Sequence, residues 1–280
     1  MVRCRREQAA DDYDEIESKA REVAEADDWI GELETEGKNG KIKNTINNAV
    51  LILQNDENLK GRLGFNEFEQ RETALKPLPW DKNVTRYPRP LSDSDDAELR
   101  LYLERCYDIT NKGQIADAVI VVSRANSYHP VRDYLDATEW DGVERLDTLF
   151  IDLFGVADTP YIRAVTRKAF CAAVARIYSP GCKFDYVTVI VGEQGIGKST
   201  TLAKMGGDWF SDSVSTLVGR EALESIQGSW LIELGELASL KKADIDAVKH
   251  FVSKKEDRFR VAYGKRIEHF PRRCVFFGTT

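Results

Sequence analysis

The segment VTVIVGEQGIGKS occupies residues 187–199 and joins two different kinds of local sequence. Residues 187–191 are a short run of apolar, mostly β-branched residues, as expected of a strand buried on both faces of a parallel sheet. The rest is rich in glycine, and residues 200–204 continue with a helical pattern. The segment therefore predicts a strand, a tight glycine loop and a helix in direct succession.

Residues 192–199 match the phosphate-loop (P-loop) pattern G-x-x-x-x-G-K-[ST] in full. The glycines let the backbone curl so that its N–H groups face phosphate oxygens. We expect Lys198 to reach the β- and γ-phosphates of ATP and to take part in catalysis, and the hydroxyl of Ser199 to ligate Mg²⁺. The predicted ATP-binding residues of this segment are Gly192, Gly195, Gly197, Lys198, Ser199 and Thr200.

Two further apolar runs follow, WLIEL at residues 230–234 and CVFF at residues 274–277. Helical stretches separate them, and this alternation favours an α/β layer with a parallel sheet. We therefore expect an α/β fold with a P-loop NTPase core over residues 181–280.

Two glutamates and two threonines lie within or shortly after these runs. A P-loop NTPase needs a carboxylate on the Mg²⁺ side of the site and a polar group that orients water. Glu233 stands at the expected strand end and is our metal-side and catalytic candidate, while Glu236 is the candidate for activating water; the two roles are interchangeable on the sequence. Thr279 or Thr280 is expected beside the γ-phosphate.

The N-terminal part of the chain has a different character. Residues 1–40 are rich in Ala and charged residues, and we expect a charged helical or partly disordered segment. Residues 41–180 carry mainly helical periodicity and predict a mostly α-helical domain before the α/β core.

Basic residues concentrate near the C-terminal end, although the formal net charge of the chain is −7. Residues 257–271 (DRFRVAYGKRIEHFP) predict a β-hairpin with Lys265 and Arg266 near its tip. Basic residues on such a hairpin suit contact with a nucleic-acid backbone, and a solvated charged surface is the alternative. Arg258 and Arg260 are alternative contacts to phosphate across a subunit interface.

Composition excludes several other classes of protein. No run approaches the roughly 18 apolar residues that span a bilayer, and the N-terminus lacks the apolar stretch of a secretory signal. The default location is therefore the cytoplasm. The five cysteines are far apart, so we expect neither a disulfide framework nor a zinc site.

Several motifs, in order, resemble the virulence-associated E family of phage-type, superfamily-3-helicase-like ATPases. They are HPVRDYL (129–135), WDG (140–142), PGCKFD (180–185), GEQGIGKST (192–200), WLIELGEL (230–237), KHFVS (249–253) and PRRCVFFGTT (271–280). The resemblance covers roughly residues 29–280 and is more specific than the P-loop alone.

The resemblance implies an ATPase motor of phage or mobile-element DNA replication, with DNA as a partner and a homo-oligomer, a hexamer among its forms. It carries Lys198, Ser199, Glu233 and Lys249 over as nucleotide-site residues. These motors usually have an Asn directly after the sensor threonines, and this sequence stops at Thr280. We therefore expect a C-terminally truncated core that binds ATP and hydrolyses it poorly.

Two other functions stay open on the sequence. A P-loop kinase acting on a nucleotide or small molecule would share residues 192–199, but it needs an acceptor pocket for which no motif is present. A non-catalytic module would bind ATP only to order the chain. DNA-stimulated hydrolysis separates the proposed motor from both.

Overall fold

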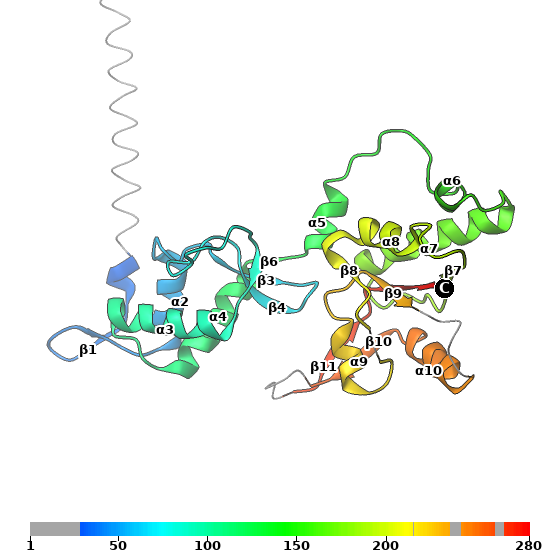
Figure 1. Ribbon diagram of the computed structural model, residues 1–280. Coiled ribbons are helices and arrows are strands. Elements are labelled where there is room, and N and C mark those ends of the chain that lie inside the picture. The colour runs from blue at the N-terminus through cyan, green and yellow to red at the C-terminus, as the bar shows by residue number, and fades with distance from the viewer. Residues whose placement is uncertain (1–28, 215, 236–241, 261–265) are drawn as a thin grey trace, which may run out of the picture. The chain divides into compact units, whose positions relative to one another are not determined.

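The computed structural model describes residues 29–214, 216–235, 242–260 and 266–280. These residues form two compact units, each with its own apolar core (Figure 1). Unit 1 comprises the described residues up to Glu67 together with Arg71–Tyr128. Unit 2 comprises Phe68–Gln70 and His129–Thr280, and it contains the phosphate-loop sequence.

Three helices supply most of the core of unit 1. They are α2 (Ile46–Asn55), α3 (Asp93–Tyr107) and α4 (Lys112–Ala125), and a short 3-10 helix, η1 (Trp29–Glu32), precedes them. Each helix begins after a residue whose side chain accepts a hydrogen bond from the first turn, namely Thr45, Ser92 and Asn111. At α3 the cap is reciprocal, because the carboxylate of Asp95 accepts from the backbone N–H of Ser92.

Unit 1 also contains a small sheet that the sequence did not lead us to expect. Its strands are β3 (Leu63–Asn66), β4 (Arg71–Ala74), β5 (Arg89–Pro90) and β6 (Ser127–Tyr128), in the order β5-β4-β3-β6, and a separate pair joins β1 (Thr35–Glu36) to β2 (Lys41–Ile42). The expectation of a mostly helical domain over residues 41–180 was incomplete for this reason. These strands are two to four residues long and include Gly, Asn and Pro, which strands disfavour, so they carry no clear alternation.

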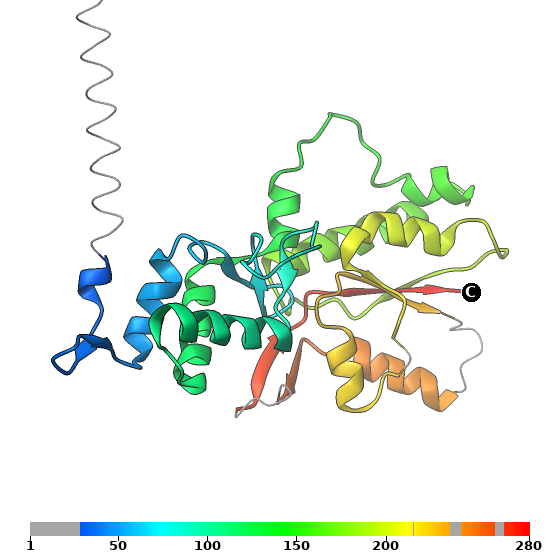
Figure 2. The same cartoon turned by 60° about the vertical axis from the view of Figure 1, so that its left-hand side comes forward.

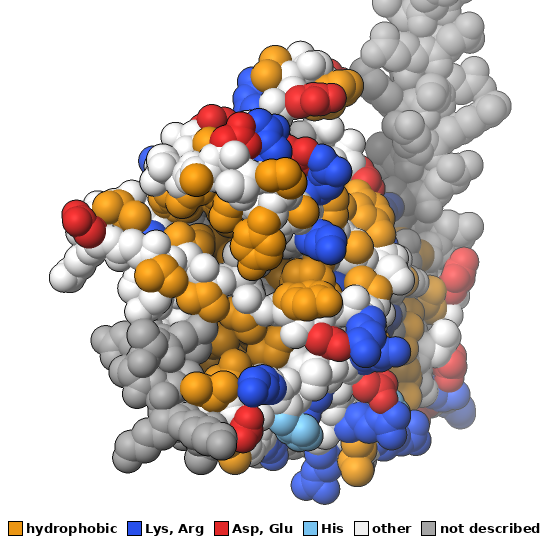
Figure 3. Space-filling model, turned by 90° about the vertical axis from the view of Figure 1, so that its right-hand side faces the viewer, with side chains coloured by type: hydrophobic (Ala, Val, Ile, Leu, Met, Phe, Trp, Pro, Cys, Tyr) orange, Lys and Arg blue, Asp and Glu red, His pale blue; other side chains and the backbone are white. Residues whose placement is uncertain are grey.

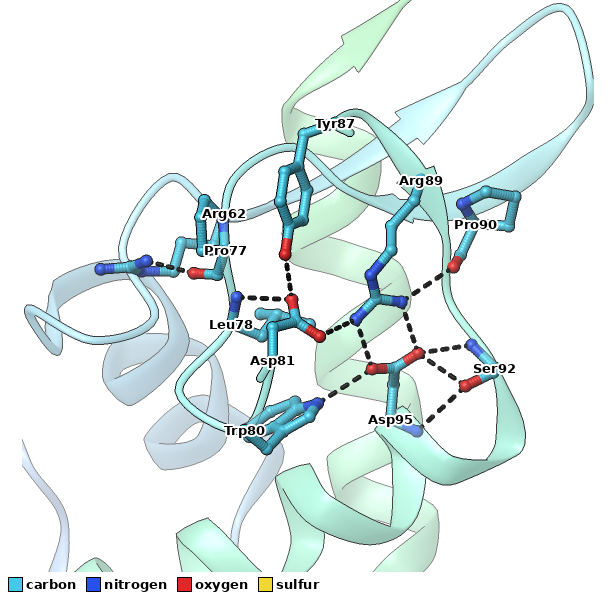
Figure 4. A network of polar contacts seen from close by, with 10 residues as sticks. All are labelled: Arg62, Pro77, Leu78, Trp80, Asp81, Tyr87, Arg89, Pro90, Ser92 and Asp95. Atoms are coloured by element: carbon cyan, nitrogen blue, oxygen red, sulfur yellow. Dashed lines mark hydrogen bonds and ion pairs between the residues drawn. The ribbon is translucent and has the colours of Figure 1, made fainter. Parts of the chain in front are cut away.

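A network of polar side chains holds the segment before α3 (Figure 4). The guanidinium of Arg89 donates to Asp81 at 2.6 Å and to the two carboxylate oxygens of Asp95 at 2.7 and 2.8 Å. Asp95 also accepts from the indole N–H of Trp80 at 2.9 Å. Burial alone would raise the pKa of the Asp95 carboxyl. The hydrogen bonds from Arg89, Trp80 and Ser92 outweigh burial and hold that pKa well below its usual value. Arg89 thus ties the loop to α3 through charged partners.

The core of unit 2 is a four-stranded sheet in the order β7-β12-β9-β8, in which every neighbouring pair is parallel. The strands are β7 (Val187–Ile190), β8 (Phe210–Ser211), β9 (Leu231–Gly235) and β12 (Val275–Thr279). Three of them coincide with the apolar runs from which a parallel sheet is predicted. The prediction of an α/β fold with a parallel sheet is therefore confirmed.

Helices cover both faces of this sheet (Figures 1 and 2). The helices α7 (Pro160–Tyr178) and α8 (Lys198–Gly206) pack on one face, and α9 (Gly219–Ser225) and α10 (Lys242–Val252) pack on the other; the short helices α5 (Pro130–Asp136) and α6 (Leu149–Phe154) precede α7. Alternate residues of β12 point to opposite faces of the sheet: Phe277 packs with α7, and Phe276 packs with α10. Among the described helices, none is both long and apolar enough to cross a bilayer.

The structure divides the chain near residue 128, whereas the sequence pattern predicts a boundary at residue 180. The physical reason is that α7 packs on the sheet of unit 2. The Phe170 and Phe277 rings lie 5.6 Å apart, and the indole N–H of Trp230 donates to the carbonyl of Ala173 at 2.9 Å. The buried Arg176 donates to the carbonyl of Cys274 at 2.6 Å, directly before β12. The helix therefore belongs to the α/β unit, although its own sequence pattern shows only that it is a helix.

An antiparallel hairpin, β10 (Glu256–Phe259) and β11 (Glu268–Pro271), connects α10 to β12. It confirms the predicted hairpin, although residues 261–265 lie outside the described residues. At its base Arg272 forms a bidentate ion pair with Asp257, at 2.8 and 2.9 Å, and both side chains are 1% exposed. The Arg272 guanidinium also lies 4.4 Å from the Phe251 ring centroid of α10, so one buried cation joins the hairpin to the helix.

Candidate functional site

A glycine loop connects β7 to α8. Gly195 and Gly197 have φ angles of 89° and 92°, in the left-handed region that L side chains rarely adopt. At Gly192 an added Cβ atom would lie 2.7 Å from Cδ1 of Ile196, so a larger residue would displace that side chain. Glycine at these three positions allows residues 192–197 to curl tightly before the helix begins.

The N-terminus of α8 adds positive potential to the loop. Gly197 is the N-cap residue and has no side chain to accept from the N–H groups of the first turn. Uncapped N–H groups at a helix N-terminus favour a bound anion, because the helix dipole places partial positive charge there. The local structure of residues 192–199 is therefore suited to phosphate.

Lys198 lies inside the loop that precedes it. Its side-chain ammonium donates to the carbonyl of Gly192 at 2.6 Å and to the carbonyl of Glu193 at 2.8 Å. The residue is only 9% exposed, which is low for a lysine. The positive charge is thus held at the centre of the curled backbone.

Glu233 meets two hydroxyl groups from other elements. Its Oε1 atom accepts from Ser199 Oγ at 2.6 Å and from Thr279 Oγ1. The register of the sheet explains this meeting: β9 and β7 both flank β12, and Thr279 pairs with Gly235 on one side and with Ile190 on the other. The carboxyl ends of the three parallel strands therefore reach the same edge of the sheet as the glycine loop.

The second carboxylate oxygen of Glu233 is buried and makes no hydrogen bond within the part of the chain that the structure describes. A buried carboxylate oxygen is costly unless it is paired with a donor or a cation. Because the residue is 5% exposed, bulk water does not offset this cost in full. Glu233 therefore offers an oxygen to a ligand beside Ser199.

An open cavity of about 730 Å³ joins these groups. It is large enough for a nucleotide, since small-molecule sites commonly occupy about 300–1,000 Å³. Its lining residues are Gly192, Gln194, Gly195, Gly197, Lys198, Ser199, Thr200, Glu233, Gly235, Thr279 and Thr280. The structure thus brings together the residues predicted from the glycine loop, the metal-side glutamate and the sensor threonine.

Other predicted site residues are not part of this group. Lys249 lies on α10, with a 72% exposed side chain that pairs with Asp246 at 3.4 Å, and it does not line the cavity. Arg266 is exposed beside β11. Glu236 and Lys265 lie outside the described residues, so their roles stay predictions.

Two aspects of the site were missed from the sequence. Gln194 and Gly235 line the cavity but were not selected, because the P-loop pattern leaves position 194 free and position 235 follows the glutamate. The shared acceptor, Glu233 Oε1, was also not foreseen. Aligning the ends of the predicted parallel strands would have brought Glu233 and Thr279 to one edge and so indicated this contact.

Comparisons with known proteins agree with the motif analysis. A protein-family model of the virulence-associated protein E-like domain matches residues 135–280. No curated protein matches the chain. Among solved structures, the apo structure of the NrS-1 C-terminal region (305–718) has a TM-score of 0.39 at 13% identity, and an A-form apo structure of the same region has a TM-score of 0.38 at 12% identity. Each match covers 78% of this chain and 53% of the other, so the chain spans about half the length of those solved chains. The family model covers more than half of the sequence, and the chain therefore belongs to the virulence-associated protein E-like family.

Proposed function

We propose that the chain binds ATP with Mg²⁺ at the glycine loop and that the protein hydrolyses it as a helicase-like motor of phage or mobile-element DNA replication. The observation that carries this proposal is the meeting of Ser199, Glu233 and Thr279 beside Lys198. A glycine turn formed by chance would not place a carboxylate and a second hydroxyl from two neighbouring strands at its mouth.

The residues present fit a magnesium ion. The hydroxyl of Ser199 and the buried Oε2 of Glu233, which has no hydrogen-bond partner among the described residues, are hard oxygen ligands of the kind Mg²⁺ prefers. Few protein ligands are needed because substrate phosphates supply others. Ser199 and Glu233 would hold the ion. When bound, Mg²⁺ would offset the negative charge of the β- and γ-phosphates.

The protein groups have distinct proposed roles in hydrolysis. Lys198 would exchange its contacts with the loop carbonyls for phosphate oxygens, which are stronger acceptors because they are charged. The hydroxyl of Thr279, held by Glu233, would orient the attacking water or the γ-phosphate. Glu233 and Glu236 are the candidates for withdrawing the proton from that water.

The proposal of a DNA-acting motor rests on family membership and on the hairpin. The arms β10 and β11 extend from the α/β unit, and the exposed Arg266 lies beside them, next to Lys265 in the sequence. Basic groups of this kind contact nucleic-acid phosphates without reading sequence. A homo-oligomer is part of the same proposal, because motors of this type use an arginine supplied in trans.

Hydrolysis of ATP by the full-length protein, with and without single-stranded DNA, tests this function. We expect Mg²⁺-dependent release of phosphate that DNA stimulates. Transfer of the γ-phosphate to a nucleoside or other small acceptor, with no effect of DNA, would instead identify a kinase. Tight ATP binding without any turnover would contradict the motor and favour a non-catalytic module.

A further inference from the structure

A second cavity in unit 2, of about 590 Å³, lies outside the glycine-loop site. Trp140 and residues 143–148, in the loop before α6, line one side of it. Arg163 and Arg167, four residues apart on α7, line the other. The upper part of the face drawn in Figure 3 shows blue Lys and Arg side chains interspersed with red Asp and Glu side chains and orange hydrophobic ones. None of these residues has a role in the proposed hydrolysis.

The loop is held in place by its own hydrogen bonds. The indole N–H of Trp140 donates to the carbonyl of Val143 at 3.3 Å, and the Asp141 carboxylate accepts from the backbone N–H of Val143 at 3.0 Å. Arg145 also donates to Asp141, and this lowers the pKa of Asp141 to about 2. The ion pair between Asp147 and Arg167 links the loop to α7. The cavity is therefore formed before any ligand enters.

The apolar part of the cavity is unusually open to solvent. Trp140 is 75% exposed, Val143 is 50% exposed and Leu146 is 38% exposed. A tryptophan normally buries most of its large ring, so an exposed indole fixed by a hydrogen bond indicates a contact surface. A flat aromatic ring in this position is suited to stacking against a nucleobase.

The arginines add donors for phosphate. Arg163 uses Nε and Nη2 to bind Asp158, and Arg167 uses the same two nitrogens to bind Asp147. In each case the Nη1 amino group makes no hydrogen bond within the described residues. The guanidinium groups are thus oriented by their carboxylate partners and still have donors to offer.

We propose that this cavity binds single-stranded nucleic acid, with a base stacked on Trp140 and the backbone phosphates on Arg163 and Arg167. The proposal rests on the proposed DNA partner, but it does not depend on the nucleotide site. A duplex keeps its bases stacked internally, so the ring of Trp140 selects a single strand. Arg266, beside β11, is not among the residues that line this cavity.

The test uses fluorescence anisotropy with a labelled oligothymidylate, without ATP and at several salt concentrations. Stacking on an aromatic side chain contributes about 1–3 kcal/mol per base, so Trp140→Ala should weaken binding about fivefold to 150-fold. Trp140→Phe should retain most of the affinity. The double variant Arg163→Ala, Arg167→Ala should weaken binding and reduce the salt slope by about one to two units.

The matched control is Lys204→Ala, Arg220→Ala, which removes two exposed positive charges elsewhere in unit 2 and should change little. Three results would overturn the proposal. One is that Trp140→Ala binds the single strand as tightly as the unaltered protein. Another is that only the variant Arg163→Ala, Arg167→Ala binds the single strand more weakly, which would indicate general electrostatic attraction. The third is that the variants change the oligomeric state in light scattering while the affinity stays the same. ATP affinity is measured separately because it tests the proposed nucleotide site. Failure of that function can then be distinguished from failure of the nucleic-acid proposal.

Discussion

The carboxylate of Glu233 and the hydroxyl of Ser199 lie 2.6 Å apart, although 34 residues separate them in the sequence. Glu233 comes from the middle of β9 and Ser199 from the first turn of α8. They meet because parallel strands end at the same edge of the sheet, where the glycine loop also lies. The contact joins the two halves of the candidate nucleotide site.

The first prediction concerns the metal role of Glu233. Glu233→Gln keeps the size of the side chain and an acceptor for Ser199, but it removes the charge that would bind Mg²⁺. We expect ATP affinity to rise by about tenfold or more when Mg²⁺ is added to the unaltered protein, and to rise much less in the variant. Calorimetric titration with Mg²⁺ and with EDTA measures this difference. Glu224→Gln, on the exposed surface of α9, is the control. An equal Mg²⁺ effect in both variants would exclude Glu233 as a ligand.

The second prediction concerns the buried pair at the base of the hairpin. Arg272→Met leaves Asp257 charged and buried without its partner, which typically costs about 3–5 kcal/mol of folding free energy. Arg258→Met breaks an exposed pair with Glu256 instead and should cost about 0–1 kcal/mol. Urea unfolding followed by circular dichroism compares the two variants. Similar urea midpoints for the two variants would show that the buried pair contributes no more to folding stability than a surface pair does.

The third prediction is a loss of stability of unit 1 in acid. Hydrogen bonds outweigh burial and lower the pKa of both Asp81 and Asp95 in the folded protein. A carboxyl group whose pKa is lower in the folded than in the unfolded protein stabilises the fold at pH values above the unfolded-state pKa, near 3.9. This stabilisation is lost as the pH falls toward the pKa of the folded state. Unfolding of unit 1 should therefore become easier below about pH 4. The Arg89→Met variant should be less stable than the unaltered protein at neutral pH, and its stability should fall less when the pH is lowered. An identical pH dependence in this variant would refute the role of Arg89.

The fourth prediction concerns the hairpin tip. The double variant Lys265→Ala, Arg266→Ala should weaken DNA binding for every sequence and reduce the salt slope by about one unit for each lost contact. ATP affinity should be retained, which also shows that the variant is folded. The double variant Lys204→Ala, Arg220→Ala removes the same charge elsewhere. If the two double variants bind DNA equally well, the hairpin is an ordinary charged surface.

The sequence predicted the α/β unit well because its signals are local. Residues 187–191 carry the apolar run of a buried strand, and the glycine pattern that follows depends on backbone angles that only glycine adopts readily. The structure places strands at all three predicted apolar runs, and Lys198, Ser199, Glu233 and Thr279 line one cavity. Lys198 and Ser199 follow from the P-loop pattern, whereas Glu233 and Thr279 follow from the predicted strand ends, and Glu233 in fact lies in the middle of β9.

What the sequence did not predict depends on tertiary contacts. The strand at Arg89–Pro90 contains a proline and is stabilised by pairing with β4 and by the ion pairs of Arg89, neither of which is visible in the local pattern. The unit boundary was misplaced because nothing in the periodicity of α7 shows what the helix packs against. The role predicted for Lys249 came from the resemblance alone, and the residue lies on the exposed side of α10.

The central claim, that the glycine loop binds ATP, is tested most directly by calorimetric titration of ATP and Mg²⁺ into the protein and into two lysine variants. Lys198→Ala removes the ammonium held inside the loop, while Lys204→Ala removes an exposed ammonium from the same helix. A hydrogen bond to a charged group contributes about 1.5–3 kcal/mol, so we expect Lys198→Ala to bind ATP about tenfold to 150-fold more weakly and Lys204→Ala to bind it normally. Unchanged ATP affinity in Lys198→Ala, or no ATP binding by the unaltered protein, would contradict the claim.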